Sequence, residues 1–414
     1  LIPQRTGPRR EQAVAKSWVE LGTMIGNPPA PEHRVTIDNY DREPYQRWSF
    51  VHMREIIPSI PITAPATPRL FDEAPRDLSG FTFEFDGRTR TWPEFLSDTY
   101  VDAMLVVHQD SAIFEYYDEG VGPDSRHIAQ SVTKSFVATV AGILIGRGVL
   151  DPEQMVTEYL PELAGTSFDG ATLQQCLDMR TGTYFDESDY ENFDSEALRG
   201  FRILGWLRRL ADDPMPHEYI ASLHNSGPHG GVFEYRSILT DVIGWVIERV
   251  TGRRINDLMS ELLWAPMGAE YDADLCVGPL SFPMFSGGLC LSVRDLARFG
   301  LLHVNGGKVG DLQVLPPEGI AAIRNDDGTL ATAFASNDHE VEFPAGAYYH
   351  NQWWVYDGPN GIYSGIGIHG QRVFVHTPSR TVIAMFSSWP HPIVDEYGLY
   401  VRAAFEALCA HLAQ

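Results

Sequence analysis

Runs of apolar residues predict two groups of β-strands, one near residue 110 and one close to the C-terminus. In the first group, residues 103–108 and 112–117 flank a short polar turn, a pattern that is typical of a β-hairpin. In the second group, four apolar runs in close succession predict four further strands. These runs cover residues 352–356, 361–368, 372–376 and 381–387.

Apolar residues at helical spacing predict helices between and after these strands. One such pattern covers residues 137–144, so its helix begins close to Ser131. A second predicted helix has its N-cap at Ser292, and a third covers residues 396–412. Residues 151 to 283 are also predicted to be mostly helical, with loops rich in Asp, Gly and Pro. Strands around a helical middle predict an α+β fold, in which helices flank an antiparallel sheet and a mainly helical lobe is inserted.

The same pattern predicts three parts of the chain. Residues 1–75 are rich in Pro and Arg and show little periodicity, so we expect an extended arm that wraps the rest. Residues 76–165 and 285–414 then form an α/β domain, and residues 166–284 form the helical lobe. With 414 residues, the chain has ample material for a large core.

The charge of the chain narrows the class of partners. A formal net charge of −24 disfavours binding to nucleic acid or to an anionic membrane surface, because acidic partners would be repelled. No apolar run reaches membrane-spanning length, and the first ten residues lack the apolar stretch of a secretory signal. The chain also starts without Met, so an upstream part can have been removed.

The four cysteines are scattered and include no Cys-x-x-Cys pair, so they indicate no disulfide framework. This pattern favours a reducing cytoplasm, while a periplasmic location stays open. The sequence leaves the oligomeric state undecided, a homodimer included.

The segment Ser131-Val132-Thr133-Lys134 combines a hydroxyl nucleophile and an amine at the start of a predicted helix. Three residues apart, the two side chains lie on one helix face, close enough for the amine to take the hydroxyl proton. The unpaired N–H groups and the positive dipole end of the first turn favour developing negative charge there. The alternative interpretation is an ordinary N-capped helix with a solvated lysine.

Tyr235 lies in a glycine-led turn ahead of the apolar helical run 242–247. A phenol placed there can point into a cleft, and a lysine ammonium beside it would lower its pKa from about 10. It could then carry a proton between the lysine and the leaving group. The ordinary alternative is a tyrosine packed on the core with its hydroxyl in water. Tyr-x-Asn tripeptides at Tyr190 and Tyr349 compete for this role, but the helix context favours Tyr235.

A glycine-rich strand supplies a third candidate element. In Gly365-Ile366-Gly367-Ile368, the alternating glycines let a ligand approach the strand backbone closely. The amides of Ser131 and Ile368 would form a two-donor oxyanion hole, in which each donor stabilises the transition state by about 3–4 kcal/mol. The alternative is a glycine-rich β-bulge that binds no ligand.

The order Ser-x-x-Lys, then Tyr235-Arg236-Ser237, then a glycine-rich strand resembles the serine β-lactamase and penicillin-binding-protein superfamily, in particular its class C and esterase branch. The resemblance runs from about residue 95 to the end and implies a β-lactamase/transpeptidase-like fold. It is supported by the stretches Met179-Arg180-Thr181-Gly182, Gly287-Gly288-Leu289, 295–300 and 367–371.

The resemblance implies a serine hydrolase that works through a covalent acyl-enzyme and needs no metal or other cofactor. Ser131 would attack the carbonyl of a small-molecule amide or ester, and Lys134 would accept its proton. Tyr235 would pass a proton to the leaving group, and water would then release the acyl group.

The resemblance also implies a set of substrate-binding residues. In an amide-cleaving member of this branch, a tyrosine on a mobile loop closes over the bound amide, and Tyr190 matches its position. Trp354 is the first choice for an aromatic wall and Trp353 the second, with core packing as the alternative for both. Ser237 and Gly367 are also expected to contact the substrate.

Two departures from the family pattern bear on the substrate. Ser237 stands where β-lactamases have an Asn and has a shorter reach. Gly365-Ile366-Gly367 replaces the Lys or His that precedes Thr-Gly, so a β-lactam or a C-terminal peptide carboxylate would lose its cationic partner. His369, two residues further on, is interpreted as structural.

These departures favour an esterase or amidase with a neutral or cationic substrate, and the resemblance implies amides of short ω-amino-acid oligomers and short-chain esters as substrates. A carboxylesterase without amide activity is one alternative, and a D-amino-acid peptidase or β-lactamase relative is another. Five acidic residues at the predicted lip could attract an ammonium group, but a solvated loop is the simpler interpretation. They are Asp186, Glu187, Asp189, Glu191 and Asp194.

Other classes of protein fit the sequence less well. None of the 14 histidines stands in a His-Glu-x-x-His motif, and no Gly-x-Ser-x-Gly occurs. The non-enzymatic alternative is a penicillin-binding-like sensor module that keeps the pocket without turnover. The presence of all three motifs together favours an enzyme.

Overall fold

A computed structural model describes residues 16–190, 192, 195–335 and 342–414. Its largest sheet has eight strands in the order β12-β13-β14-β15-β16-β5-β6-β2. All neighbours in this sheet pair antiparallel except β2 and β6, which pair parallel. The strands are β2 (Asp72–Glu73), β5 (Val101–His108), β6 (Ser111–Tyr117), β12 (Tyr348–His350), β13 (Trp353–Asp357), β14 (Ile362–Gly367), β15 (Gln371–His376) and β16 (Thr381–Ser387).

The described residues also form three smaller sheets. A four-stranded sheet has the order β1-β8-β9-β7, and β3 with β4 and β10 with β11 form two hairpins. Their bounds are β1 (Ser59–Ile62), β3 (Thr82–Phe85), β4 (Arg88–Thr91), β7 (His127–Ile128), β8 (Ala273–Cys276), β9 (Leu289–Leu291), β10 (Lys308–Val309) and β11 (Leu312–Gln313).

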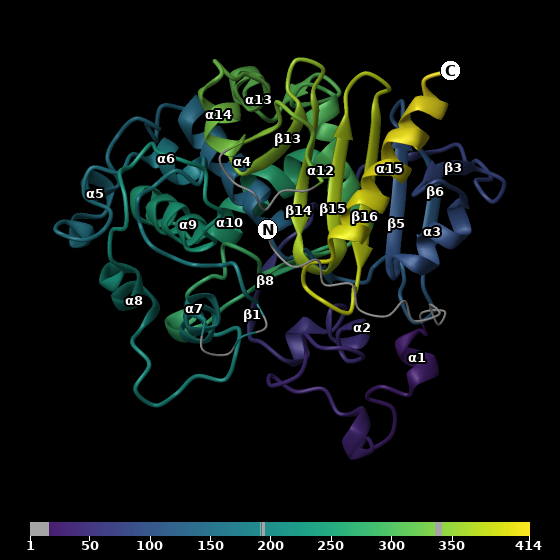
Figure 1. The fold of residues 1–414 in the computed structure, drawn as a ribbon, viewed down its shortest axis with the longest axis horizontal. Coiled ribbons are helices and arrows are strands. Elements are labelled where there is room, and N and C mark those ends of the chain that lie inside the picture. Colours follow the sequence, from purple (N-terminus) through teal and green to yellow (C-terminus); the bar gives the residue numbers. More distant parts are fainter. Residues whose placement is uncertain (1–15, 191, 193–194, 336–341) are drawn as a thin grey trace.

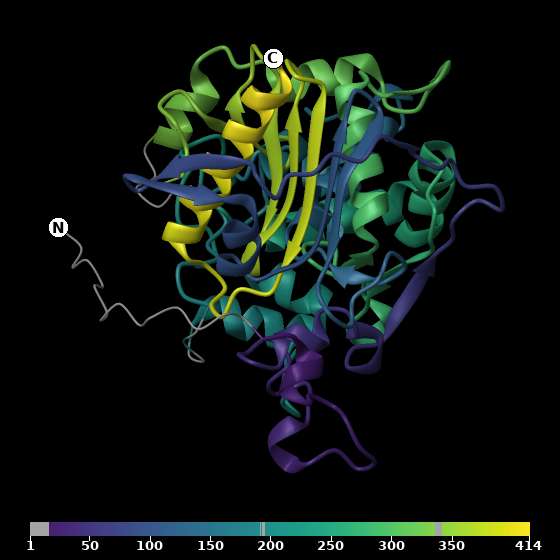
Figure 2. The same ribbon diagram turned by 90° about the vertical axis from the view of Figure 1, so that its right-hand side faces the viewer.

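Helices cover both faces of the large sheet. Helix α15 (Asp395–Leu412) lies on one face together with α3 (Trp92–Asp98), as Figure 1 and Figure 2 show. On the other face, α12 (Val293–Val304) packs on β5, β15 and β16, and α4 (Val132–Gly146) packs on β14 and β15. The predicted α+β fold is therefore confirmed.

The remaining helices lie mostly in the lobe beside α4. Figure 1 shows α5 to α10 grouped on one side of the sheet. The bounds are α1 (Trp18–Leu21), α2 (Gln46–Ser49), α5 (Val156–Tyr159), α6 (Leu173–Leu177), α7 (Glu196–Leu204), α8 (Pro216–Ser222), α9 (Ile238–Thr251), α10 (Ile255–Met259), α11 (Ala265–Met267), α13 (Pro317–Arg324) and α14 (Thr329–Ala335).

The hairpin, the four late strands and the helices predicted by residue range agree with the structure to within a few residues. The range 151–283, predicted as mostly helical, also contains strand β8. The hairpin is formed by β5 and β6, and α12 begins after Ser292, whose side chain accepts a hydrogen bond from the Asp295 amide at 3.0 Å. Strand β14 ends at Gly367, one residue before the predicted end. There the chain enters a short turn in which His369 has a φ of 60°.

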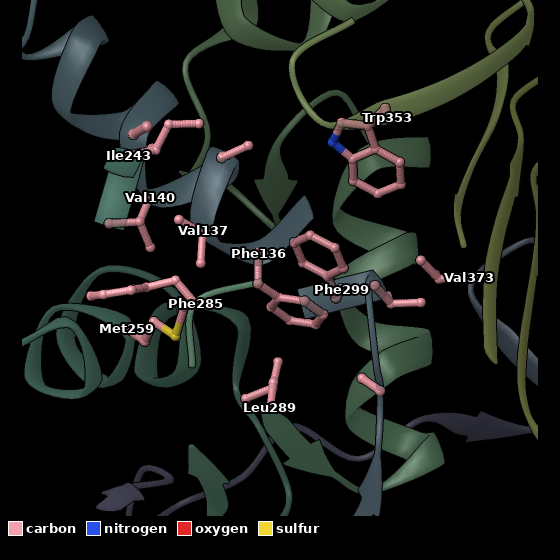
Figure 3. Close-up of a cluster of buried hydrophobic side chains, with 14 of the residues drawn as sticks. Phe136, Val137, Val140, Ile243, Met259, Phe285, Leu289, Phe299, Trp353 and Val373 are labelled. Carbon is pink, nitrogen blue, oxygen red and sulfur yellow. The ribbon is translucent and has the colours of Figure 1, made fainter. Parts of the chain in front are cut away.

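Helix α4 is buried on almost every side, which is why its sequence is apolar around the whole helix. Figure 3 shows Phe136, Phe299 and Trp353 in the cluster that fills the space between α4, α12 and β13. The ring of Phe136 stacks on that of Phe299 at 3.7 Å between centroids, and Phe299 stacks on Trp353 at 5.6 Å. This packing fixes α4, so the position of Ser131 at its N-terminus follows from the core.

The segment predicted as an arm connects the two larger sheets. Its strand β1 pairs with β8 of the small sheet, and β2 pairs with β6 of the large one. Arg47, between α1 and β1 in the chain, forms ion pairs with Asp102 and Asp118. The arm also contains the short helices α1 and α2 (Figure 1). Among the described residues, no helix combines the length and apolar character that a membrane span requires.

Two glycine substitutions test how closely the helices around α4 pack. An added Cβ at Gly244 in α9 would lie 2.1 Å from a ring atom of Phe285, whereas one at Gly142 in α4 would meet no atom within 4 Å. We expect Gly244→Ala to lower the free energy of unfolding by about 1–3 kcal/mol. Gly142→Ala should instead raise it by up to about 1 kcal/mol, because alanine is the better helix former. Urea unfolding of both variants measures this, and equal stabilities would contradict the packing.

Candidate active site

Ser131 stands at the junction between β7 and α4. The residue before it, Gln130, has a φ of 47°, a conformation that costs a residue with a side chain about 1 kcal/mol or more. The neighbouring amide of Ala129 donates to the carbonyl of Leu289 at 2.8 Å and holds this turn against β9. The strained turn places the Ser131 side chain at the N-terminal end of α4.

Lys134 lies directly behind the Ser131 hydroxyl. Its Nζ is 2.8 Å from Ser131 Oγ and 2.6 Å from the carbonyl oxygen of Ser286. The same nitrogen is 5.0 Å from the centre of the Tyr235 ring. The side chain is 1% exposed, so water does not compete for these contacts. An amine held this way has the geometry to exchange a proton with the serine.

Burial makes this amine a usable base. It lowers the pKa of Lys134 to about 8, because the interior stabilises the charged ammonium less than water does. The carboxylates of Glu187 and Asp241 act in the opposite direction and favour the ammonium. Burial raises the pKa of Asp241, while Lys134 opposes that rise. The lysine is thus neutral in part of the molecules near neutral pH, as a general base requires.

Tyr235 is held by an aromatic wall and by its neighbour in sequence. Its ring stacks on Trp354 at 5.4 Å and meets the edge of Tyr349 at 6.0 Å. The guanidinium of Arg236 donates to the carbonyl of Thr181 at 2.7 Å and fixes the backbone of this segment. Of the three tyrosines considered from the sequence, Tyr235 is the one placed beside Lys134 and Ser131.

A cavity of about 860 Å³ opens in front of these residues. Ser131, Tyr235, Tyr190 and Trp354 line it. The end of β14 also borders it, and there the oxyanion-hole candidate Ile368 follows Gly367. Most of the residues predicted as a site therefore come together around one space.

The glycines of β14 were expected to let a ligand approach the strand, but in the structure they make room for other parts of the chain. An added Cβ at Gly367 would lie 2.6 Å from the carbonyl oxygen of Ala129, and one at Gly365 would lie 3.0 Å from Ser135 Oγ. The turn before α4 thus approaches the strand at Gly367, and the first turn of α4 approaches it at Gly365. The glycines bring Ser131 and the end of β14 together, with Gly367 still at the border of the cavity.

Three of the residues considered from the sequence do not line the cavity, namely Trp353, Ser237 and His369. Trp353 faces the core, where it stacks on Phe299, so core packing accounts for it. The side chain of Ser237 donates to Glu187 at 2.7 Å, and substrate contact by Ser237 stays a prediction. His369 is 1% exposed and its Nδ1 lies 2.7 Å from the Trp389 carbonyl oxygen, in agreement with a structural role.

The interpretation of the acidic lip as a solvated loop is wrong for Glu187. Its side chain is 9% exposed and accepts hydrogen bonds from Ser237 and Tyr190. Asp186 and Asp189 are exposed, as expected for a loop. The two other predicted lip residues, Glu191 and Asp194, lie outside the described residues.

Three partners of Lys134 were not identified from the sequence. Ser286 contributes only a backbone carbonyl, which no side-chain pattern could reveal. Glu187 is far from Lys134 in the chain, and nothing in its loop distinguishes it from its acidic neighbours. Asp241 did carry a signal, because it is a carboxylate inside the apolar run of α9, where an acid needs a buried partner. In the described part of the chain, no group of three or more His, Cys, Asp or Glu residues is placed to hold a metal ion.

A serine beside a buried lysine at the start of a helix, next to an antiparallel sheet, is the arrangement typical of serine hydrolases of the Ser-x-x-Lys type. The sequence model of the family described as Beta-lactamase matches residues 98–407. This match covers more than half of the chain, and the chain belongs to that family. Its relatives named below are hydrolases, and this protein is an enzyme of the same kind.

Among its relatives, the chain is similar to 6-aminohexanoate-dimer hydrolase of Paenarthrobacter ureafaciens, with 35% identity over 88% of this chain and 91% of that one. A solved structure of a candidate 6-aminohexanoate-dimer hydrolase from Bacillus anthracis superimposes with a TM-score of 0.83, at 28% identity. That comparison covers 93% of this chain and 98% of the other. Esterase EstB of Burkholderia gladioli is 31% identical over a shorter stretch, 33% of this chain and 36% of its own.

The environment of Lys134 predicts the pH dependence of the reaction. We expect kcat/KM for an ester to rise with pH through about 8, because only the neutral amine, which predominates above the lowered pKa of Lys134, can accept the serine proton. Asp241→Asn removes a carboxylate that favours the ammonium, so it should move this rise to lower pH. Asp395→Asn, at the exposed border of the same cavity, is the matched control and should leave it in place. Identical profiles for Asp241→Asn and wild type would contradict this account.

Proposed function

We propose that the enzyme hydrolyses amide bonds of 6-aminohexanoate-type linear oligomers, and short-chain carboxylic esters, through an acyl-enzyme on Ser131. The observation that carries this proposal is the 2.8 Å contact between Lys134 Nζ and Ser131 Oγ at the wall of a large cavity. The relative of 35% identity, which matches this chain along most of its length, supports the choice of substrate.

The contacts around Ser131 support a two-step reaction. Ser131 Oγ forms a bond to the substrate carbonyl carbon as its proton passes to neutral Lys134. The bond to the leaving nitrogen or oxygen then breaks, and that atom takes a proton through Tyr235. In the second step, water gives a proton to the Lys134–Tyr235 pair and its oxygen attacks the acyl carbon. The acid is released, and Ser131 recovers its proton. The amides of Ser131 and Ile368 would hold the negative oxygen in both steps.

The lining of the cavity fits a chain of methylene groups. Trp354 and Phe343 stack on each other at 5.0 Å and form an apolar wall, and Tyr184, Val232 and Ile393 expose apolar surface at the border. Apolar walls with a few polar groups near the reaction centre are typical of small-molecule sites. They match an aliphatic oligomer better than a highly charged substrate.

The charges near β14 disfavour a substrate that depends on a carboxylate anchor. Arg372 borders the cavity, but it is 4% exposed and its guanidinium forms a 2.8 Å ion pair with Glu342. Gly365-Ile366-Gly367 offers no cation. These features argue against a D-amino-acid peptidase or a β-lactamase, in which a cation next to this strand holds a carboxylate.

The second candidate function is a carboxylesterase without amide activity. The stretch shared with Esterase EstB favours it, because that protein is named for ester cleavage. The chemistry at Ser131 would be the same in both cases. The two candidates differ in what holds the leaving group, and here Tyr190 is the residue of interest.

Replacement of the nucleophile tests the mechanism. Hydrolysis of p-nitrophenyl acetate and of the linear 6-aminohexanoate dimer should both fall by at least about 10³-fold in Ser131→Ala, because the acyl-enzyme can no longer form. Ser188→Ala, an exposed hydroxyl at the border of the same cavity, is the control and should keep both activities. If wild type cleaves the ester but not the dimer, the mechanism still holds, and the protein is a carboxylesterase without amide activity. Full activity in Ser131→Ala would exclude this serine.

Removal of the Tyr190 hydroxyl separates amides from esters. If Tyr190 holds the amide of the scissile bond, Tyr190→Phe should lower kcat/KM for the dimer by about tenfold or more, the equivalent of one lost hydrogen bond. The value for p-nitrophenyl acetate should change by less than about threefold. Steady-state kinetics on both substrates measures the difference. Equal losses would show that Tyr190 does not contact the amide.

A further inference from the structure

Glu187 connects the loop that carries Tyr190 to the segment that carries Tyr235. The backbone N–H of Ser237 donates to its Oε2. The hydroxyls of Ser237 and Tyr190 donate to its Oε1 at 2.7 Å and 3.0 Å. A buried carboxylate requires donors of this kind, and these three satisfy it. Glu187 therefore holds the Tyr190 side chain at the border of the cavity.

The surroundings of Glu187 decide which way the proton of Tyr190 points. Burial raises the pKa of Glu187, while Lys134 on α4 and the hydrogen bonds from Ser237 and Tyr190 lower it. Arg236 beside Ser237 and Asp241 on α9 are further charged groups that act on it. The Ser237 amide can only donate, so the carboxylate group must accept there. Three donors converge on its two oxygens, an arrangement that suits the ionised form, and an ionised carboxylate has no proton to give. The Tyr190 hydroxyl then donates its single proton to Glu187.

We infer that Glu187 is a positioning residue that makes the site select amides over esters, by fixing the direction of the Tyr190 hydroxyl. This inference rests on the proposed function, because it concerns amide substrates bound beside Ser131. Because Tyr190 donates its proton to Glu187, its phenolic oxygen can only accept a hydrogen bond from a substrate. The N–H of a scissile amide can donate to it.

An ester presents the opposite chemistry at the same point. Its bridging oxygen has no proton, so it meets the Tyr190 oxygen lone pair to lone pair and forms no hydrogen bond with it. A site built to bind an N–H discriminates strongly against an analogue that lacks one, since a buried polar group loses its hydrogen bond. Without Glu187, the Tyr190 hydroxyl could turn its proton to the substrate. It could then donate to the oxygen of an ester as well as accept from the N–H of an amide.

The test compares two substrates that differ in one group. One is the linear 6-aminohexanoate dimer, and the other is its ester isostere with oxygen in place of the scissile N–H. In Glu187→Gln, the ratio of kcat/KM for amide to ester should fall about tenfold, which corresponds to the loss of one hydrogen bond. Asp189→Asn, an exposed acid on the same loop, is the matched control and should keep the wild-type ratio. Glu187→Asp keeps both carboxylate oxygens, whereas the amide in Glu187→Gln keeps one acceptor, which must face the Ser237 N–H. The ratio of the Asp variant should therefore lie between the other two.

A double mutant shows whether the effect runs through Tyr190. In a Tyr190→Phe background, Glu187→Gln should cause no further change in the ratio, because the hydroxyl that it directs is absent. An unchanged ratio in Glu187→Gln, or the same fall with and without the Tyr190 hydroxyl, would overturn the inference. A general loss of structure would lower both activities together and leave the ratio as it was.

Binding to inactive protein separates this inference from the proposed function. Calorimetry with Ser131→Ala measures Kd for both isosteres without turnover. If wild type hydrolyses neither isostere, the proposed function fails, and the binding ratio still decides the role of Glu187. If the protein prefers to bind the amide and this preference disappears when Glu187→Gln is added, the role of Glu187 is supported. If the ratio of the two Kd values does not change when Glu187→Gln is added, the role is refuted.

Discussion

The burial of one amine at the start of α4 is the constraint on which the site depends. Lys134 can act as a base only because it is removed from water, and it is removed from water because α4 is enclosed on almost all sides. The cost of this desolvation is offset by the Ser286 carbonyl and by the carboxylates of Glu187 and Asp241. The catalytic arrangement is thus a consequence of how the core is filled.

The same packing positions β14, which forms another part of the cavity wall. Gly365 and Gly367 let α4 approach β14 so closely that Ser131 and the end of this strand border one space. The aromatic cluster around Trp354 supports Tyr235 from the opposite direction. Chemistry that joins residues from α4, β14 and the segment before α9 therefore relies on contacts distant in sequence, and small changes in that packing would separate the reacting groups.

Much of the fold could be predicted from the sequence, because local pattern and tertiary structure agree in it. The β5–β6 hairpin, α12 after its cap at Ser292 and the strands β13 to β16 each carry their own periodicity or turn signal. The comparison with known proteins then placed the chain in the Beta-lactamase family. The solvated interpretation of Glu187 failed, because a carboxylate in a polar loop looks the same in sequence whether it faces water or a buried amide.

By itself, the sequence determined the Ser-x-x-Lys motif, the segment around Tyr235 and the glycine-rich strand, because each is a short pattern with a local conformational reason. Only the tertiary structure decided which residues surround Lys134 and which of two adjacent tryptophans meets the cavity. Trp353 and Trp354 alternate across β13, so the packing of the sheet determines which one faces α12 and which one faces Tyr235. Burial and electrostatic fields are sums over distant residues, and for this reason no local pattern contains them.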